Sequence, residues 1–188
     1  DLWLGKIADS RLWQGLVTVC GHWGTMMRLA ENPSHVLTQA ERLAAESFVA
    51  DQEARFAVAR SRIIRTGDEL SFVCDGVLEY GDVSDFCGLI LDRDDNPPQV
   101  AAVAAKRMGG DWAVSLRSRD GLAGRVMSLL KDGRKVRGGG HGDASALYFP
   151  SNYTEMQIKD SLLAAIRVQI EKEASPKVTL GDLFKGLA

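Results

Sequence analysis

The apolar residues of this chain change from a helical to a strand-like spacing near Gly67. Asn32 and Pro33 are residue types that open helices, and Gly67 is one that ends them. The sequence therefore predicts one long helix over 32–66, about 50 Å long at 1.5 Å per residue, which favours a rigid arm between two domains. Its apolar face comprises Leu37, Ala40, Ala44, Phe48, Phe56, Ala59 and Ile63.

The remainder of the chain alternates short apolar runs with amphipathic stretches. Strands are expected at 69–74, 99–105, 112–119 and 144–149, and helices at 83–91, at 122–130 and after the capping pair Ser151-Asn152. This order predicts an α/β fold, in which helices flank a small mixed β-sheet. The chain divides into 1–31, a connector with short helices, 32–66, the long interdomain helix, and 67–188, a second domain.

Composition narrows the class of protein. A hydrophobic fraction of 45% is ample for a packed core, and no apolar run reaches the length that spans a bilayer, so no membrane partner is expected. Cys20, Cys74 and Cys87 lack the spacing of a metal site, which favours a reduced, cytoplasmic protein. The chain opens at Asp1 without an initiator methionine or a signal pattern, so we expect a missing N-terminal portion.

Charge is distributed unevenly along the chain. Residues 67–95 hold nine acids and one base, a balance of 1 − 9 = −8, whereas residues 106–137 hold nine bases and three acids, a balance of 9 − 3 = +6. The second segment predicts a basic surface that concentrates anions, although solvated faces of ordinary helices and strands give the same count.

Two arginines stand out within the basic segment. If 115–119 is a strand, Val114 and Leu116 face the core while Arg117 and Arg119 lie on the other side. Two guanidinium groups about 7 Å apart along a strand match one phosphate or two adjacent phosphates. The alternative is an edge strand with a solvated basic face.

A glycine-rich loop follows shortly afterwards. Gly138, Gly139 and Gly140 precede His141, and so many glycines indicate a backbone shape that other residues avoid. Their N–H groups are open to close approach by an anion, and the histidine is able to donate to a phosphate or ribose oxygen. A flexible surface hairpin is the alternative, but the nearby arginines favour ligand binding.

Together these segments resemble the DHH-associated domain, the C-terminal substrate-binding domain of DHH-family phosphoesterases. The resemblance is carried by Ser115-Leu116-Arg117-Ser118-Arg119, a short helix, and Gly138-Gly139-Gly140-His141 followed by Ala144-Ser145. It covers nearly the whole chain and is most specific over 114–147. It implies that 67–188 is the substrate-binding domain and that 1–66 is the connector that follows a catalytic domain.

The sequence departs from the family's pattern at two places. Arg137 stands where the glycine run commonly begins, and Ser145-Ala146 replaces a pair that usually ends in glycine. An arginine at this position either adds a phosphate contact or blocks part of the cradle. The departures leave the identity of the substrate open among short RNA, a cyclic dinucleotide, a nucleoside bisphosphate and polyphosphate.

The family's Asp-His-His triplet, which helps to hold two manganese ions, is absent from this chain. The resemblance therefore implies no catalytic residue, metal ligand or cofactor in the fragment, which is expected to be inactive alone. Manganese and phosphoester hydrolysis are expected of the parent's missing N-terminal catalytic domain.

The leading hypothesis is a substrate-recognition domain. Arg117, Arg119, His141 and the N–H groups of Gly138–Gly140 would bind a phosphorylated nucleotide or short oligonucleotide. A second hypothesis is a non-catalytic RNA- or single-stranded-DNA-binding module, since related domains occur in alanyl-tRNA synthetases. A third is a domain that only joins two copies of the parent as a homodimer.

Overall fold

The computed structural model describes residues 9–31, 36–74, 76–79, 81–93, 95–131 and 136–174. The chain is divided into two compact units, Asp1–Val58 and Ala59–Ala188. Its helices and one mixed sheet confirm the α/β class. None of the helices in the described ranges combines the length and apolarity needed to cross a membrane.

The first unit contains two short helices and most of a longer one. α1 spans Ser10–Cys20, α2 spans His22–Glu31 and α3 spans Gln39–Ser61. Leu16, Leu37 and Ala45 form its small core. α1 approaches α3 closely at Gly15, where an added Cβ would lie 3.1 Å from the carbonyl oxygen of Ala45.

The long helix is shorter than the sequence predicts. The proposed cap at Asn32-Pro33 lies outside the described residues, and the helix begins at Gln39. Thr38 and Glu41 form a capping box there: the Thr38 N–H donates to Glu41 Oε2 at 2.9 Å, and the Glu41 N–H donates to Thr38 Oγ1 at 3.3 Å. At its other end the helix stops at Ser61, because the following residues join a sheet instead.

The second unit is built on a six-stranded sheet with the order β1-β2-β3-β4-β6-β5. Only the β2–β3 pair is parallel; the other neighbours are antiparallel. Two of the strands were not expected from the sequence, since β1 was assigned to the long helix and β5 to a loop. The strands are β1 (Ile64–Thr66), β2 (Leu70–Cys74), β3 (Val100–Lys106), β4 (Trp112–Arg117), β5 (Arg137–His141) and β6 (Ala144–Phe149).

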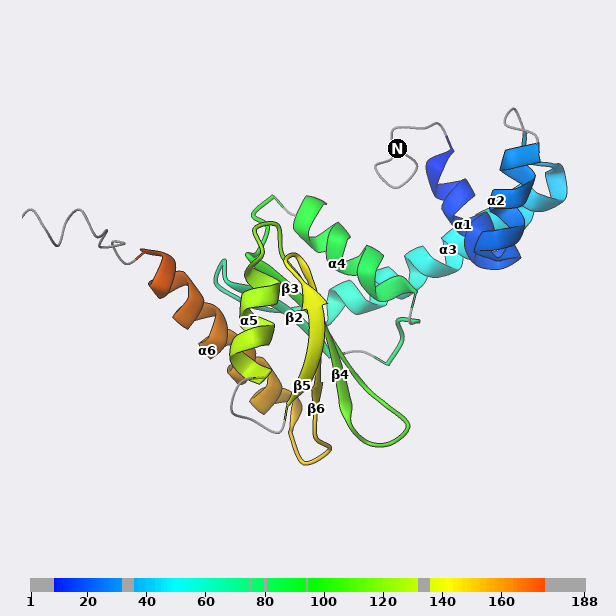
Figure 1. Ribbon diagram of the computed structural model, residues 1–188. Coiled ribbons are helices and arrows are strands. Elements are labelled where there is room, and N and C mark those ends of the chain that lie inside the picture. The colour runs from blue at the N-terminus through cyan, green and yellow to red at the C-terminus, as the bar shows by residue number, and fades with distance from the viewer. Residues whose placement is uncertain are drawn as a thin grey trace, which may run out of the picture. The chain divides into compact units, whose positions relative to one another are not determined.

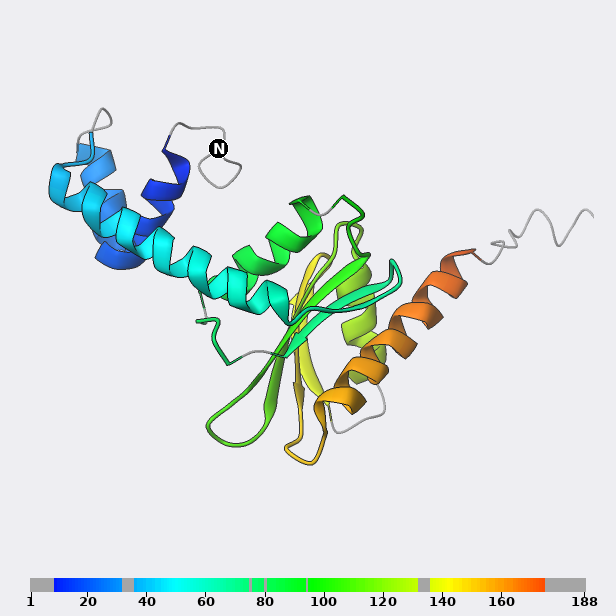
Figure 2. The same ribbon diagram turned by 180° about the vertical axis from the view of Figure 1, so that it is seen from behind.

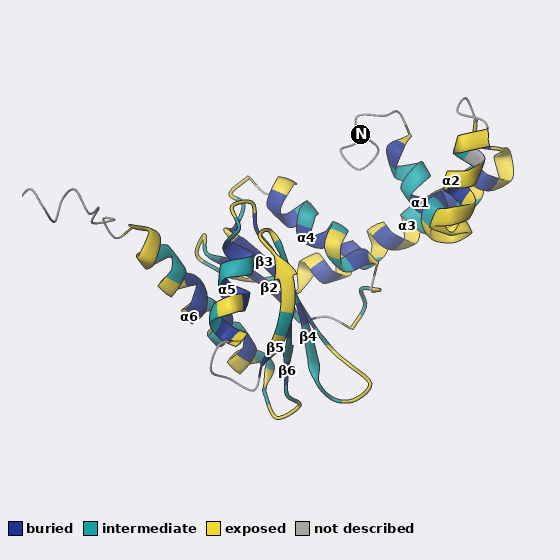
Figure 3. Cartoon of the chain, in the orientation of Figure 1, coloured by how far each residue is buried: buried dark blue, intermediate teal, exposed yellow. Residues whose placement is uncertain are grey.

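Three helices cover this sheet unequally, as Figures 1 and 2 show. α5 (Leu122–Lys131) and α6 (Glu155–Ala174) lie together on one face, over a core that includes Leu116, Leu147 and Ile158. α4 (Asp82–Arg93) lies on the other face and packs mainly on β3 and β4. β6 and β5 therefore keep an open surface beside α4, and Figure 3 shows β5 largely exposed.

The last helix begins later than the sequence predicts. The expected cap was the Ser151-Asn152 pair, but the first helical residue is Glu155. A reciprocal pair caps it: the Thr154 N–H donates to Gln157 Oε1 at 2.8 Å, and the Gln157 N–H donates to Thr154 Oγ1 at 3.2 Å. The capping motif is of the expected type, displaced by two residues.

A paired charge links the sheet to α6. Arg167 donates from Nε and Nη2 to the two oxygens of Glu69, both at 2.9 Å. These hydrogen bonds lower the pKa of Glu69 below its ordinary value of 4.5, while partial burial opposes the shift and the charge of Arg167 supports it. A carboxyl whose pKa falls on folding stabilises the folded state above its unfolded pKa.

Glu69→Gln is therefore expected to lower the unfolding midpoint at neutral pH, by only about 2 °C or less because the pair is exposed. The difference from the wild type should shrink as the pH falls below about 4.5 and through the lower folded-state pKa of Glu69. Thermal melts of both proteins across this range measure it. A difference that stays constant with pH would show that the ion pair is not its source.

Candidate functional site

β4 presents Arg117 on the open side of the sheet, as its alternating pattern predicts. Val114 and Leu116 are buried against α5 and α6, so Arg117 points toward α4. Its guanidinium donates to Ser84 Oγ at 3.1 Å and to the Leu116 carbonyl oxygen at 2.9 Å. These two bonds fix the direction of the side chain and leave other N–H donors of the guanidinium for a ligand.

His141 lies on the same face as Arg117. The sheet register pairs Arg117 with Ala144 and Ala144 with His141, so the three residues form one row across β4, β6 and β5. Two inter-strand spacings separate the arginine and histidine Cα atoms by about 10 Å. The intervening side chain is a methyl group, so both long side chains can reach one small anion lying above it.

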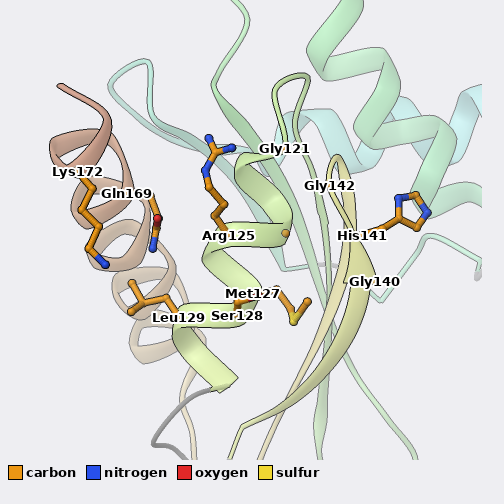
Figure 4. A pocket seen from close by; sticks show the side chains of 11 residues that line it. Gly121, Arg125, Met127, Ser128, Leu129, Gly140, His141, Gly142, Gln169 and Lys172 are labelled. Carbon is orange, nitrogen blue, oxygen red and sulfur yellow. The ribbon is translucent and has the colours of Figure 1, made fainter. Parts of the chain in front are cut away.

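The histidine ring is turned toward this open face. Figure 4 shows it projecting from β5 away from Arg125, Gln169 and Lys172, which belong to α5 and α6. Within the described part of the chain the ring has no hydrogen-bond or ion-pair partner. Its nitrogens are therefore available to a ligand.

The next row across the sheet forms a floor of small residues. Ser115 pairs with Ala146, and Ala146 pairs with Gly139. A Cβ added to Gly139 would meet no atom within 4 Å. This part of the surface has room for a flat group beside the arginine and the histidine.

The three glycines form an edge strand rather than the loop predicted from the sequence. Gly138 is needed for packing, because an added Cβ would lie 2.9 Å from a methyl carbon of Leu147. Gly140 has a φ of 139°, and an added Cβ would lie 2.5 Å from backbone atoms of β6. Since alternate N–H groups of an edge strand point away from its partner, the three groups do not converge into one cradle.

The turn between β5 and β6 is anchored to the start of α5. Asp143 Oδ1 accepts a 2.6 Å hydrogen bond from the Gly121 N–H, and the Gly142 carbonyl oxygen accepts one of 2.7 Å from the Gly124 N–H. The Ser118 N–H, directly after β4, donates to the Asp143 carbonyl oxygen at 3.0 Å. This network holds the histidine strand against the arginine strand, and an acidic residue in a two-residue turn was the signal for it in the sequence.

The Arg119 side chain contacts α4 and does not belong to the row of Arg117, Ala144 and His141. It follows the end of β4 and donates from Nη2 to the Leu91 carbonyl oxygen and, at 2.9 Å, to Asp92 Oδ1. Both acceptors belong to the C-terminal end of α4, where a cation is favourable. Its contacts are therefore those of a side chain that holds α4 in place.

A cavity of about 520 Å³ lies on the face of the sheet that α5 and α6 cover, between these two helices and beside the β5–β6 turn. Arg125, at its edge, donates to the Asp120 carbonyl oxygen at 2.8 Å and pairs with Glu173 at 2.9 Å. Arg117 is not part of its lining. Gly140 and His141 do line this cavity, although Figure 4 shows the His141 ring projecting away from Arg125 and Lys172. Because Arg117 lies on the α4 side, the cavity does not bring the predicted arginine and histidine together.

Possible metal ligands and the Cys87 thiol are the remaining reactive groups to place in the described residues. Among them, no group of three or more His, Cys, Asp or Glu side chains is placed to hold a metal ion. Cys87, on α4 near Arg117, is fully buried, and burial raises its pKa to about 12 against the opposing charge of the arginine. The thiol stays protonated and is not a nucleophile at neutral pH.

Comparisons with known proteins return distant structures. No family model and no curated protein matches the chain. Among solved structures, the C-Ala domain of Aquifex aeolicus alanyl-tRNA synthetase is 15% identical with a TM-score of 0.43, covering 55% of this chain and 96% of that one. The DHH domain of a member of the s1p family of ribosomal proteins is 18% identical with a TM-score of 0.41, covering 70% and 34%.

A third similar structure is PggH, a pGpG-specific phosphodiesterase from Vibrio cholerae. It is 11% identical with a TM-score of 0.47, and the match covers 78% of this chain and 51% of that one. The chain thus spans about a third and about half of the two longer proteins. With TM-scores below 0.5, none of these three likenesses carries a functional conclusion for this chain.

Proposed function

We propose that this chain is the substrate-recognition part of a DHH-type phosphoesterase, and that the open face of β4, β6 and β5 binds a phosphorylated nucleotide. The observation that carries the proposal is the single row formed by Arg117, Ala144 and His141. In this row the Arg117 guanidinium and the His141 imidazole, both hydrogen-bond donors, stand on either side of the small Ala144 side chain.

Each group has a distinct task in this proposal. Arg117, oriented by Ser84, binds two oxygens of a phosphate through parallel N–H donors. His141 donates to a third phosphate oxygen or to a ribose hydroxyl from across the row. The floor at Gly139 and Ala146 accepts the sugar or the base, because neither residue fills that space.

The bond-breaking step is assigned to another part of the parent protein. Hydrolysis of the phosphodiester or phosphomonoester of a nucleotide or short oligonucleotide would take place in a manganese-dependent catalytic domain. In this proposal the chain described here contributes binding and orientation of the substrate. Arg119 belongs to the support of this surface through its bonds to α4 rather than to the ligand contacts.

Binding of AMP and of adenosine to the 188-residue chain, measured by calorimetry, tests the proposal. We expect AMP to bind more tightly than adenosine, and Arg117→Gln and His141→Gln each to weaken AMP binding by about 10- to 100-fold, since charge-assisted hydrogen bonds are lost. Lys172→Gln is the matched control, because it removes a cation from the opposite face. Thermal melts establish that each variant folds.

Other outcomes would contradict the proposal in different ways. Equal affinity for AMP and adenosine would show that the phosphate is not recognised. A loss in Lys172→Gln with none in Arg117→Gln would move the site to the cavity between α5 and α6. Salt-dependent binding of long RNA that ignores a 5′-phosphate would instead support the non-catalytic RNA-binding hypothesis.

A further inference from the structure

A second basic and aromatic cluster lies on the same open face, at the end of the strands away from His141. Arg107, Arg137 and Tyr148 line a cavity of about 340 Å³ together with Gly138 and Gly139. Tyr148 pairs with Arg137 in the sheet register, two residues beyond the floor formed by Gly139 and Ala146. The cluster therefore continues the surface to which the proposed function assigns a nucleotide.

The tyrosine ring and one arginine form a cation–π pair. The Arg107 guanidinium carbon lies 5.6 Å from the centroid of the Tyr148 ring. Within the described residues the tyrosine hydroxyl has no hydrogen-bond partner. Planar guanidinium and aromatic groups are the surfaces on which single-stranded bases stack.

The other arginine is only loosely held. Arg137 Nη2 lies 3.6 Å from Asp111 Oδ2, and the two side chains are 77% and 42% exposed. Exposed pairs of this kind contribute little to stability. A phosphate can therefore replace Asp111 as the partner of the Arg137 guanidinium at a small cost in free energy. With two arginines and one aspartate, the cluster carries a balance of 2 − 1 = +1.

The cluster is too far from His141 to share one phosphate with it. The Arg137 and His141 rows lie four residue steps apart along β5, about 13 Å along a strand. The anchors also diverge, since Arg117 is held by Ser84 of α4 and Arg137 lies by Asp111 in the β3–β4 turn. Two phosphates of one oligonucleotide can bind at Arg117 and at Arg137, whereas a single phosphate cannot reach both.

We propose that Arg107, Tyr148 and Arg137 form a second nucleotide subsite, so that the ligand is a single-stranded oligonucleotide of at least two nucleotides. This inference rests on the proposed function for the first subsite. The terminal phosphate lies at Arg117 and His141, the next base stacks on the Tyr148–Arg107 pair, and the second phosphate binds Arg137.

The test compares AMP with the 5′-phosphorylated dinucleotide pApA as ligands of the 188-residue chain. In the wild type, pApA should bind about tenfold or more tightly than AMP, the gain typical of a stacked base. Tyr148→Leu and Arg137→Gln should each remove most of this gain while changing AMP affinity less than about twofold. Arg107→Gln, at an exposed position, repeats the test should the tyrosine variant fold poorly.

The variants separate this inference from the proposal beneath it. Arg117→Gln should weaken both ligands equally, and Lys172→Gln should weaken neither. Equal wild-type affinities for AMP and pApA, or equal losses of both in Tyr148→Leu, would overturn the second subsite while the first stands. The proposed function itself would be overturned if AMP did not bind to the wild type and if Arg117→Gln left the affinity for pApA unchanged.

Discussion

Replacing Gly139 with valine is expected to weaken AMP binding by about tenfold or more while leaving the fold intact. The glycine faces open space on the side of Arg117 and His141, with no atom within 4 Å of an added Cβ. A branched side chain there would fill the floor that the proposed ligand needs. Its strand conformation suits valine, so the unfolding midpoint should stay equal or rise slightly.

Calorimetric titration with AMP and a thermal melt of the same sample measure the two effects separately. Gly139→Ala is the graded control and should give a smaller loss of affinity, because one methyl group occupies less of the floor. Full AMP affinity in a correctly folded Gly139→Val protein would mean that the ligand does not lie over this strand.

Gly140→Ala is expected to have the largest effect on stability, a loss of about 2–3 kcal/mol or more. The residue has a φ of 139°, which side chains rarely adopt. An added Cβ would also lie 2.5 Å from the Ala144 carbonyl oxygen and from the Ser145 Cα. Both are backbone atoms of the neighbouring strand, so the strain cannot be relieved by rotating a side chain.

Denaturant unfolding of the three alanine variants at 138, 139 and 140 measures this prediction. The expected order of stability is Gly139→Ala above Gly138→Ala, with Gly140→Ala lowest. The middle position of Gly138→Ala follows from its 2.9 Å approach to a flexible leucine methyl and to a carbonyl oxygen of β6. Equal stability of all three would contradict the strand geometry described for β5.

Much of the second unit was predictable because its elements are short and strongly patterned. The alternation at Val114 and Leu116 fixed the inward face of β4, and the apolar spacing of Leu122, Val126 and Leu130 defined α5. Residues 64–66 were assigned to the helix because Gly67 was taken as its end, and only pairing with β2 makes Ile64–Thr66 a strand. The helix starts were displaced because several neighbouring residues are competent caps.

The candidate site was predictable in its residue types but not in its geometry. Arg117 and His141 were singled out from sequence, and the structure places them in one row. The strand spacing predicts the same face of the sheet for Arg117 and Arg119. The structure differs for Arg119, because its side chain bonds to the C-terminal end of α4. The contribution of Asp143 and the proximity of Tyr148 to Arg107 come from contacts between distant segments, which a local pattern does not contain.

The anchored β5–β6 turn has a consequence for how securely the histidine is placed. A strand made mostly of glycine carries few side chains that could oppose slippage along its neighbour, and a slip by one position would turn His141 to the opposite side of the sheet. The bonds from Gly121 and Gly124 to the turn prevent that slip. The face of the sheet on which the His141 ring lies is therefore fixed by the hydrogen bonds between α5 and the β5–β6 turn, and not by β5 itself.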